Sequence, residues 1–338
     1  MKKVICIGSA LKDIFLPTGD GHVTQTPEDI MAKRKITFEL GAKYRIENRF
    51  TSAGGGALNV AIGLARLGVS SAPYALIGDD AIGMWIRDIL VKNNVKTEML
   101  RQVSKEQTDL SMILVDRKSG ERVVFVNRDL QEKLIVDGAL MDTQSLLFVS
   151  ALSGNWQQNY TTIRNAVLTQ GATLAYNPGQ SNMNDSIDAV YQMIDIAQYL
   201  FVNKDEAIQI VAQRKHERAR LDDTVYLLEQ LRAHGAQTVV ITAGFAGAWM
   251  LHKDAIYFVP SSGARPVDTT GAGDAFTSGV LAAFIHGEMP ATACAWGAAN
   301  AMRVVQFYGS NEGLISLAMM RTHAELFLPK VKKTVLAG

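Results

Sequence analysis

Short apolar runs of strand length alternate with helical patterns along most of this chain. The runs are Val4–Ile7, Ser71–Ile77, Leu146–Val149, Thr173–Tyr176, Tyr199–Val202 and Thr238–Thr242. Amphipathic helical patterns lie between them, for example at Ala81–Asn93 and Asp223–His234. Strands connected through helices pair in parallel, and helices then cover both faces of the sheet. The alternation predicts an α/β fold with a large, doubly wound, mostly parallel sheet.

Two regions break this alternation and predict a second, smaller sheet. The polarity of Lys35–Leu40 alternates with a period of two. Thr108–Asp116 and Glu121–Arg128 alternate in the same way on either side of Lys118-Ser-Gly120, which is typical of a hairpin. We expect a small β lid that excludes water from a reaction. An edge extension of the main sheet or a dimerisation surface explains the same pattern, and a lid can also form a homodimer interface.

These interruptions suggest how the chain is organised. Its 338 residues fit one large α/β domain with a small appendage. We assign residues 1–13, 51–106 and 129–338 to the core, which binds nucleotide and substrate. Residues 14–50 and 107–128 are assigned to the lid.

Composition limits the partners and the setting of the protein. Hydrophobic residues make up 48% of the chain, and the formal net charge is +1. A sizeable core is expected, and a nucleic-acid-binding surface is not. Cys6 and Cys294 lie far apart in apolar surroundings, as buried thiols of a reduced protein do. The apolar runs are shorter than a membrane span, so we expect a cytoplasmic protein without a membrane partner.

The segment Pro266–Phe276 carries the strongest chemical signal. Gly271, Ala272 and Gly273 precede Asp274, and a helix-like apolar run follows. Unpaired N–H groups at a helix N-terminus bind anions, and small side chains let a phosphate come close to the backbone. A carboxylate there can take a proton from a hydroxyl that attacks phosphorus. A plain turn followed by a first-turn acidic residue explains the segment equally well.

Several other reaction classes lack their sequence signals. The chain has no Gly-x-x-x-x-Gly-Lys-Ser/Thr, no His-Glu-x-x-His, no Cys-x-x-Cys and no Gly-x-Ser-x-Gly. P-loop nucleotidases, zinc enzymes and serine hydrolases of that type are therefore disfavoured. The first strand is not followed by Gly-x-Gly-x-x-Gly, which opposes a dinucleotide-dependent oxidoreductase.

Three motifs in this order resemble those of a known family. Gly54–Gly68 is similar to its N-terminal signature, Asp268–Phe276 to its C-terminal signature, and Ile77–Gly83 to a segment between them. The family is that of the ribokinase or PfkB-type carbohydrate kinases, which include adenosine kinase. The resemblance covers nearly the whole chain and implies a ribokinase-like fold.

The resemblance implies ATP-dependent phosphorylation of a hydroxymethyl group on a sugar or nucleoside. Asp274 would be the general base. The N–H groups of Gly271, Ala272 and Gly273 would form an anion hole that stabilises charge on the transferred phosphoryl group. This agrees with the reading of the glycine turn from its residues, because phosphoryl transfer depends on positioning and charge stabilisation.

The resemblance also assigns residues on the nucleotide side. Asn203 and Glu206 match the Asn-x-x-Glu motif that organises Mg²⁺ and phosphate, acting through water. The same pair fits a helix capping box, and both roles are compatible. Thr242 and Gly244 match a strand end beside the ATP phosphates, and Asn300 matches a position near the adenine. An ordinary strand-end turn and a local hydrogen bond on an apolar helix are the alternatives.

On the substrate side, Asp13 matches the family acid that accepts hydrogen bonds from substrate hydroxyls. Gly54 and Gly55 would form the hinge between lid and core, and Asn59 would donate to and accept from the substrate. A turn residue and a residue of the first helical turn are the alternatives for Asp13 and Asn59.

A monovalent cation often lies near the anion hole in this family. Asp268 and the carbonyl of Thr270 match part of that site. The segment Val304–Asn311 departs from the ribokinase-like pattern. Activation by K⁺ is therefore left open.

The identity of the substrate is only partly constrained. Gly56 stands where family members acting on sugar phosphates, and ribokinase itself, commonly have lysine. A sugar or sugar acid leads, and a nucleoside is the alternative, with a ligand-binding protein without turnover third. Phe38, Phe125 and Trp156 could stack on a base, although we expect core packing for each.

Overall fold

The computed structural model describes residues 3–26, 34–46, 48–118, 122–214 and 216–336. Within them, ten strands form one sheet, in the order β16-β15-β14-β13-β12-β11-β10-β1-β6-β7. Their bounds are β1 Lys3–Ile7, β6 Ser71–Gly78, β7 Leu100–Val103, β10 Ser145–Val149, β11 Thr173–Tyr176, β12 Tyr199–Asn203, β13 Thr238–Thr242, β14 Ala248–His252, β15 Ala255–Val259 and β16 Lys332–Val335. Neighbours in the run β13-β12-β11-β10-β1-β6-β7 all pair in parallel, which confirms the predicted sheet. Strands β14 to β16 add an antiparallel edge.

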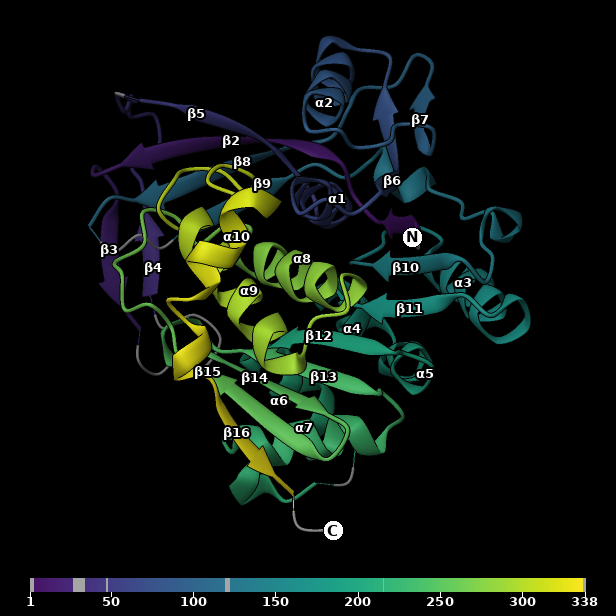
Figure 1. Cartoon of the computed structure of the whole chain (residues 1–338). Helices are drawn as coiled ribbons and strands as arrows, with labels where there is room; N and C mark the ends of the chain where they lie inside the picture. The colour runs from purple at the N-terminus through teal and green to yellow at the C-terminus, as the bar shows by residue number, and fades with distance from the viewer. Residues whose placement is uncertain (1–2, 27–33, 47, 119–121, 215, 337–338) are drawn as a thin grey trace.

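Helices cover both faces of this sheet (Figure 1). One face carries α1 Gly56–Arg66, α2 Ala81–Lys92, α8 Ala272–Ile285, α9 Pro290–Val304 and α10 Leu317–Ala324; the other carries α3 Trp156–Gln170, α4 Gln180–Asp185, α5 Ile187–Asp195, α6 Lys204–Ala212 and α7 Thr224–Ala233. Strand β1 shows how one sheet supplies two cores. Val4 and Cys6 pack on the side of α8, and Ile5 and Ile7 pack on the side of α7. Successive side chains of a strand point to opposite faces, so a strand buried on both faces is apolar throughout.

A separate small sheet, which contacts α1 and α2, has the order β5-β2-β8-β9 (Figure 1). Its strands are β2 Leu11–Thr18, β5 Phe50–Gly54, β8 Leu110–Asp116 and β9 Arg122–Val126. The predicted hairpin corresponds to β8 and β9, although Ser119, Gly120 and Glu121 lie outside the described residues. The predicted strand at Lys35–Leu40 corresponds to β4 (Arg34–Thr37), which ends three residues earlier than expected. It pairs with β3 (His22–Gln25) in a two-stranded sheet of its own.

The predicted division into core and lid cuts two strands of the small sheet. The boundary after residue 13 falls inside β2, and the boundary after residue 50 falls inside β5. Both strands have weak sequence signals. Lys12 and Asp13 after a buried strand look like a turn, and Ser52-Ala-Gly54 consists of small residues that do not favour strands.

The register of the small sheet gives its two faces different character. Asp13 pairs with Ser52 on one side and Ser111 on the other, so three polar side chains share one face. Ile14 pairs with Met112, and Met112 pairs with Phe125, so the opposite face is apolar. Residues that pair directly across strands point to the same side of a sheet. The face with Asp13 points toward the core domain, where Tyr308 packs on Phe15 and Ile113.

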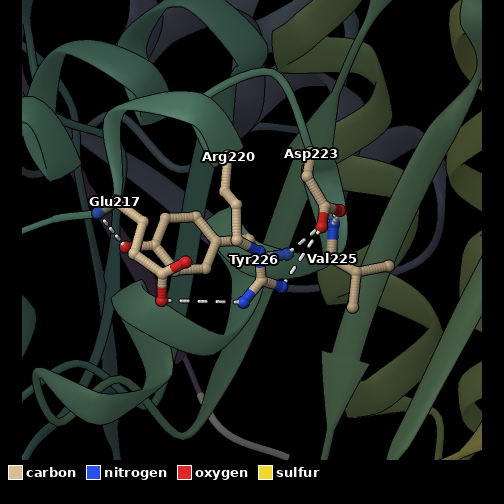
Figure 2. A network of polar contacts seen from close by, with 5 residues as sticks. All are labelled: Glu217, Arg220, Asp223, Val225 and Tyr226. Atoms are coloured by element: carbon tan, nitrogen blue, oxygen red, sulfur yellow. Dashed lines mark hydrogen bonds and ion pairs between the residues drawn. The ribbon is translucent and has the colours of Figure 1, made fainter.

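A polar network fixes the start of α7 on the other side of the main sheet (Figure 2). The carboxylate of Asp223 accepts a hydrogen bond of 2.9 Å from the N–H of Val225, and the guanidinium of Arg220 reaches the same carboxylate at 3.2 Å. Arg220 also lies 4.4 Å over the ring of Tyr226, whose hydroxyl accepts from the N–H of Glu217. An aspartate that caps a helix in this way has a structural role.

Two expectations from composition can be compared with the structure. Cys6 and Cys294 are both buried and free, as predicted. Among the residues that the structure describes, no helix combines the length and the apolar character needed to cross a membrane.

Candidate active site

The glycine turn leads into helix α8, as the sequence predicts. Gly271 caps the helix with a φ of 76°, in the left-handed region that favours glycine. A Cβ on Gly271 would also lie 2.7 Å from the Cα of Ser310, whereas Gly273 has open space around it. Ala272, Gly273 and Asp274 occupy the first turn, where N–H groups lack intrahelical partners. The N–H of Ala272 points back to the carbonyl of Thr269 at 3.3 Å, so Gly273 offers the more open donor.

Asp274 is half-buried at this helix start and contacts the substrate side of the molecule. Its Oδ2 accepts a hydrogen bond of 2.8 Å from Nδ2 of Asn59 on α1. Burial raises the pKa of Asp274 to about 6, and the negative charge of Asp13 acts in the same direction, while the bond from Asn59 opposes them. A carboxylate with a pKa close to neutrality suits a general base.

Asp13 lies on β2, buried between the small sheet and the core domain. Its Oδ1 accepts from the hydroxyl of Ser111, and its Oδ2 accepts from Ser310 at 3.3 Å. Burial raises the pKa of Asp13 to about 6 despite these two bonds, and the charge of Asp268 raises it further. A Cβ on Gly54 would lie 2.0 Å from Oδ2 of Asp13. Glycine at this position therefore leaves the space that the carboxylate occupies.

Asn59 lies in the first turn of α1 and is buried. Gly55 precedes the helix with a φ of 100°, and a Cβ there would lie 2.3 Å from the carbonyl oxygen of Ser9. The Oδ1 of Asn59 accepts a hydrogen bond of 3.1 Å from Nδ2 of Asn311. Both ends of the Asn59 amide therefore have protein partners, which the sequence did not indicate.

A cavity of about 290 Å³ opens on the other side of the α8 N-terminus. Thr242 and Gly244 line it from the end of β13, and Ala272 and Gly273 line it from α8. The remaining wall is mainly apolar and includes Phe245, Val259, Pro260, Phe276, Ala298, Ala301, Met302 and Val305. An apolar cleft with a few polar groups at one end fits a planar base whose phosphates reach the helix start.

Asn300 does not line this cavity, although Ala298 and Ala301 do. Its side chain is fully buried between α8 and α9. Nδ2 donates to the carbonyl of Ala275 at 3.0 Å, and Oδ1 accepts from the N–H of Ile315 at 3.0 Å. The structure therefore places Asn300 as a packing residue that ties α9 to α8, in line with the alternative of a local hydrogen bond.

Asn203 and Glu206 form the capping box at the start of α6. The N–H of Glu206 donates to Oδ1 of Asn203 at 2.8 Å, and the N–H of Asn203 donates to Oε2 of Glu206 at 2.9 Å. Burial raises the pKa of Glu206 to about 7 against the bond from Asn203, and the nearby charge of Asp274 contributes. Glu206 therefore faces the same charged region as Asp274.

The described residues contain no group of three or more His, Cys, Asp or Glu side chains that could hold a metal ion. A divalent cation at Glu206 would need water and phosphate oxygens as its other ligands. Mg²⁺ commonly binds in this way, through one or two carboxylates together with substrate phosphates. The residues present fit that mode of binding.

Asp268 organises the turn that precedes the glycines and is almost completely buried. Its Oδ1 accepts from the N–H and the hydroxyl of Thr270, at 3.0 and 2.7 Å. Its Oδ2 accepts from the N–H of Gly309 at 3.3 Å. The carboxylate thus links the turn at 268–271 to the segment that begins at Gly309.

The small sheet contacts this turn from the other side. The guanidinium of Arg122 on β9 donates to the hydroxyl of Thr269, and Arg265 reaches the carbonyl of Lys118 at 3.5 Å. The edge of the small sheet therefore lies beside the segment that leads into the anion-binding turn.

Sequence reasoning missed three polar residues of this site, namely Ser111, Ser310 and Asn311. The alternation of β8 carries a signal for Ser111, because it places a polar residue on the face of Asp13. Ser310 and Asn311 lie in the segment that departs from the family pattern. Of the aromatic residues, Trp156 is buried as expected. The expectation of core packing is wrong for Phe38 and Phe125, because they are 38% and 55% exposed.

Comparisons with known proteins agree with this geometry. A family model described as pfkB family carbohydrate kinase matches residues 1–316. A nucleoside kinase of Methanocaldococcus jannaschii is 25% identical over 316 residues, covering 93% of this chain and 94% of the relative. A fructokinase of Vibrio alginolyticus is 25% identical over 234 residues, covering 68% of this chain and 75% of the relative.

Solved structures share the fold at lower identity. The Methanocaldococcus jannaschii nucleoside kinase, an archaeal member of the ribokinase family, superposes with a TM-score of 0.75 at 21% identity, covering 96% of this chain and 99% of that one. An Escherichia coli structure in complex with ATP and Mg²⁺ superposes with a TM-score of 0.76 at 18% identity, covering 96% and 100%. The fold is therefore ribokinase-like.

Proposed function

The chain belongs to the pfkB family of carbohydrate kinases, and we propose that it transfers the γ-phosphoryl group of ATP to a hydroxymethyl group of a sugar or sugar-like substrate. One observation carries the proposal. Asp274 directly follows Gly273, which lines the apolar cavity together with Thr242, and its carboxylate accepts a hydrogen bond from Asn59 and faces the charge of Asp13. A base at this position can reach a hydroxyl on one side and a phosphate on the other.

In the proposed reaction, Asp274 takes the proton of the attacking hydroxyl. The substrate oxygen then forms a bond to the γ-phosphorus, and the bond from that phosphorus to the bridging oxygen of ATP breaks, which releases ADP. The N–H groups at Gly271 to Gly273 hold the negative charge on the transferred group. The open space at Gly273 allows a phosphoryl oxygen to approach the backbone.

Glu206 and Asn203 would hold Mg²⁺ through water in this scheme. The cation would neutralise charge on the ATP phosphates. Without a cation, the charge of Asp274 helps to raise the pKa of Glu206. A divalent ion beside Glu206 would favour both carboxylates in their charged form.

Asp13 is the proposed acceptor for substrate hydroxyls. Ser111 and Ser310 hold its carboxylate in place, and Gly54 leaves room beside it. Gly56 provides no cation for a substrate phosphate at the position where sugar-phosphate kinases commonly have lysine. An unphosphorylated sugar or sugar acid is therefore the leading substrate class.

A nucleoside is the second candidate, supported by an aromatic pair beside the substrate side. The rings of Phe50 and Tyr308 stack with centroids 4.3 Å apart and an angle of 17° between their planes. Tyr308 lies two positions before Ser310, which contacts Asp13, and Phe50 is 39% exposed. An aromatic surface here could hold a base by stacking. The relative named a nucleoside kinase also aligns along more of this chain than the fructokinase does.

The small sheet is proposed to act as a lid and as the surface of a homodimer. Its outer face carries Met112 and Phe125, which are 38% and 55% exposed. An exposed apolar sheet face is covered when a second copy packs on it. Light scattering after size-exclusion chromatography should give a dimer for the native chain and a monomer for Phe125→Asp. The proposed setting is the cytoplasm, in keeping with two buried free thiols.

A monovalent cation at Asp268 and the carbonyl of Thr270 is part of the proposal inherited from the family. Asp268 already accepts three hydrogen bonds, so its carboxylate is well satisfied by the protein. Turnover measured in K⁺, Na⁺ and tetramethylammonium salts at equal ionic strength tests the site. Activation by K⁺ alone supports it, and equal rates in the three salts exclude it.

An ADP-release screen tests the function as a whole. The purified chain is supplied with ATP and Mg²⁺ and with single sugars, sugar acids and nucleosides, and ADP is measured. Release that depends on one acceptor class identifies the substrate class. Binding of ligands in calorimetry without ADP release from any acceptor would point to a protein of the kinase fold that does not turn over.

A further inference from the structure

Residues 309–311 lie against each part of the candidate site. The N–H of Gly309 donates to Asp268, the hydroxyl of Ser310 donates to Asp13, and the amide of Asn311 donates to Asn59. Ser310 occupies the space where a Cβ at position 271 would lie, so only glycine fits at that position. The segment that departs from the family pattern is therefore packed directly against the substrate side of the anion-binding turn.

The orientation of the Asn311 amide is fixed by its neighbours. Nδ2 lies 2.5 Å from the carbonyl oxygen of Ala53 and 3.1 Å from Oδ1 of Asn59. A backbone carbonyl can only accept, so the oxygen of Ala53 fixes the donor end of the Asn311 amide on this side. Its Oδ1 is buried and has no hydrogen-bond partner. The side chain therefore acts here only as a donor.

This donor in turn determines the orientation of Asn59. Because Oδ1 of Asn59 accepts from Asn311, Nδ2 of Asn59 is directed to the carboxylate of Asp274 at 2.8 Å. If the Asn59 amide were reversed, its oxygen would face the Asp274 carboxylate, and two acceptors would repel each other. Asn311 makes the productive orientation the favoured one.

We propose that Asn311 is a positioning residue for the general base, acting through the amide of Asn59. The inference rests on the proposed role of Asp274. Asn311 holds Asn59, and Asn59 holds Oδ2 of Asp274, which leaves Oδ1 of that carboxylate to accept the proton of the substrate hydroxyl. Asn311 lies outside the three motifs that resemble those of the family, so its role is additional to theirs.

Other charged or titratable groups also face Asp274. Asp13 comes from β2, Glu206 from α6 and the Cys6 thiol from β1. Asn311 and Asn59 are neutral, so replacing either with an apolar residue leaves these charges unchanged. A change in the proton affinity of Asp274 in such variants then reports the hydrogen bond itself.

Asn311→Leu tests the relay, because leucine has a similar volume and no donor. The buried Oδ1 of Asn311 makes no bond, so its removal breaks no acceptor interaction. The titration of Asp274 is followed by ¹³C NMR of the carboxyl carbons, with the signal assigned from Asp274→Asn. We expect the pKa of Asp274 to rise by about one pH unit, about a tenfold gain in proton affinity. Glu312→Gln, at the neighbouring exposed position, should leave it unchanged.

A double-mutant cycle separates the relay from a general effect on structure. In the Asn59→Ala background, Asn311→Leu should leave the pKa of Asp274 where Asn59→Ala put it. An equal rise with and without the Asn59 amide, or no rise at all, would overturn the proposal. Asn311→Ala serves in the same cycle if the leucine variant does not give a folded protein.

The kinetic readout distinguishes this inference from the proposed function. The ratio of kcat/KM between native protein and Asn311→Leu should grow as the pH falls from about 8 to about 5.5. A ratio that is constant with pH would indicate a merely structural role and would overturn the relay. Because the NMR titration needs no turnover, failure of every acceptor to release ADP would count against the kinase proposal and leave the relay tested.

Discussion

Nδ2 of Asn59 donates a 2.8 Å hydrogen bond to Oδ2 of Asp274, across 215 positions of sequence. The contact joins the start of α1 to the start of α8, so the two glycine-rich signatures meet at a single carboxylate. The bond also sets the balance at Asp274. Burial and the charge of Asp13 raise the pKa to about 6, and the bond from Asn59 limits that rise.

The raised pKa values predict how stability depends on pH. Asp13 and Asp274 have pKa values of about 6 in the folded chain, and Glu206 has about 7. Each lies above the ordinary value, so the folded state keeps protons that the unfolded state releases between about pH 4 and 7. The free energy of unfolding should therefore fall as the pH rises through this window. The loss is complete about one pH unit above the pKa of Glu206, near pH 8.

Asp274→Asn isolates one of these contributions. The variant should be more stable than the native chain at pH 8 by about 1 to 3 kcal/mol, and the two should converge near pH 4. Urea unfolding at both pH values measures the difference. Asp254→Asn, in an exposed turn between β14 and β15, is the matched control. If the difference in free energy of unfolding between Asp274→Asn and the native chain is the same at pH 4 and pH 8, the pKa of Asp274 is not raised.

Gly54→Ala should impair the substrate side selectively. The new Cβ would lie 2.0 Å from Oδ2 of Asp13, so the carboxylate must move from its place between Ser111 and Ser310. We expect KM for the acceptor to rise by about tenfold or more, while KM for ATP changes little. Gly19→Ala is the control, because its Cβ would have open space. A larger effect on ATP than on the acceptor would reassign Asp13.

The small sheet should become more protected when both ligands bind. Arg122 on β9 contacts Thr269 beside the anion-binding turn, so this edge of the sheet is placed to cover a bound ligand. Hydrogen exchange in β8 and β9 should slow on adding acceptor together with a non-hydrolysable ATP analogue, and so should exchange at residues 36–40, beside the two-stranded sheet. The sheet would not be a lid if exchange there were the same with and without ligands.

Six of the seven parallel strands of the main sheet were predictable, because each carries its own apolar signal. The seventh, β7, was missed, because Arg101 and Gln102 are exposed and interrupt its apolar pattern. Thr173–Tyr176 and Thr238–Thr242 are strands with the predicted bounds. A strand that is buried on both faces is a continuous apolar run, so it can be recognised without knowing which strands pair with it. Strand β2 has charged residues at Lys12 and Asp13, and only its pairing with β5 and β8 shows that Asp13 faces inward.

The site was predictable where backbone geometry demands particular residues. Gly271 and Gly55 have positive φ and contacts that exclude a side chain, so glycine in the sequence marks them. Asn300 shows the limit of this reasoning. A polar residue on an apolar helix can face a ligand or a neighbouring helix, and its sequence pattern is the same in both cases. In the structure, Asn300 has hydrogen bonds to Ala275 and Ser278 on α8 and to the N–H of Ile315.

Single-turnover ADP formation by Asp274→Asn tests the central claim most directly. The acceptor is the one found in the screen, ATP affinity is measured in parallel by calorimetry, and Asp254→Asn is the control. The account predicts a rate lower by about two orders of magnitude or more, because the base is lost, with ATP affinity largely kept. A rate close to that of the native chain would contradict the role of Asp274 as general base.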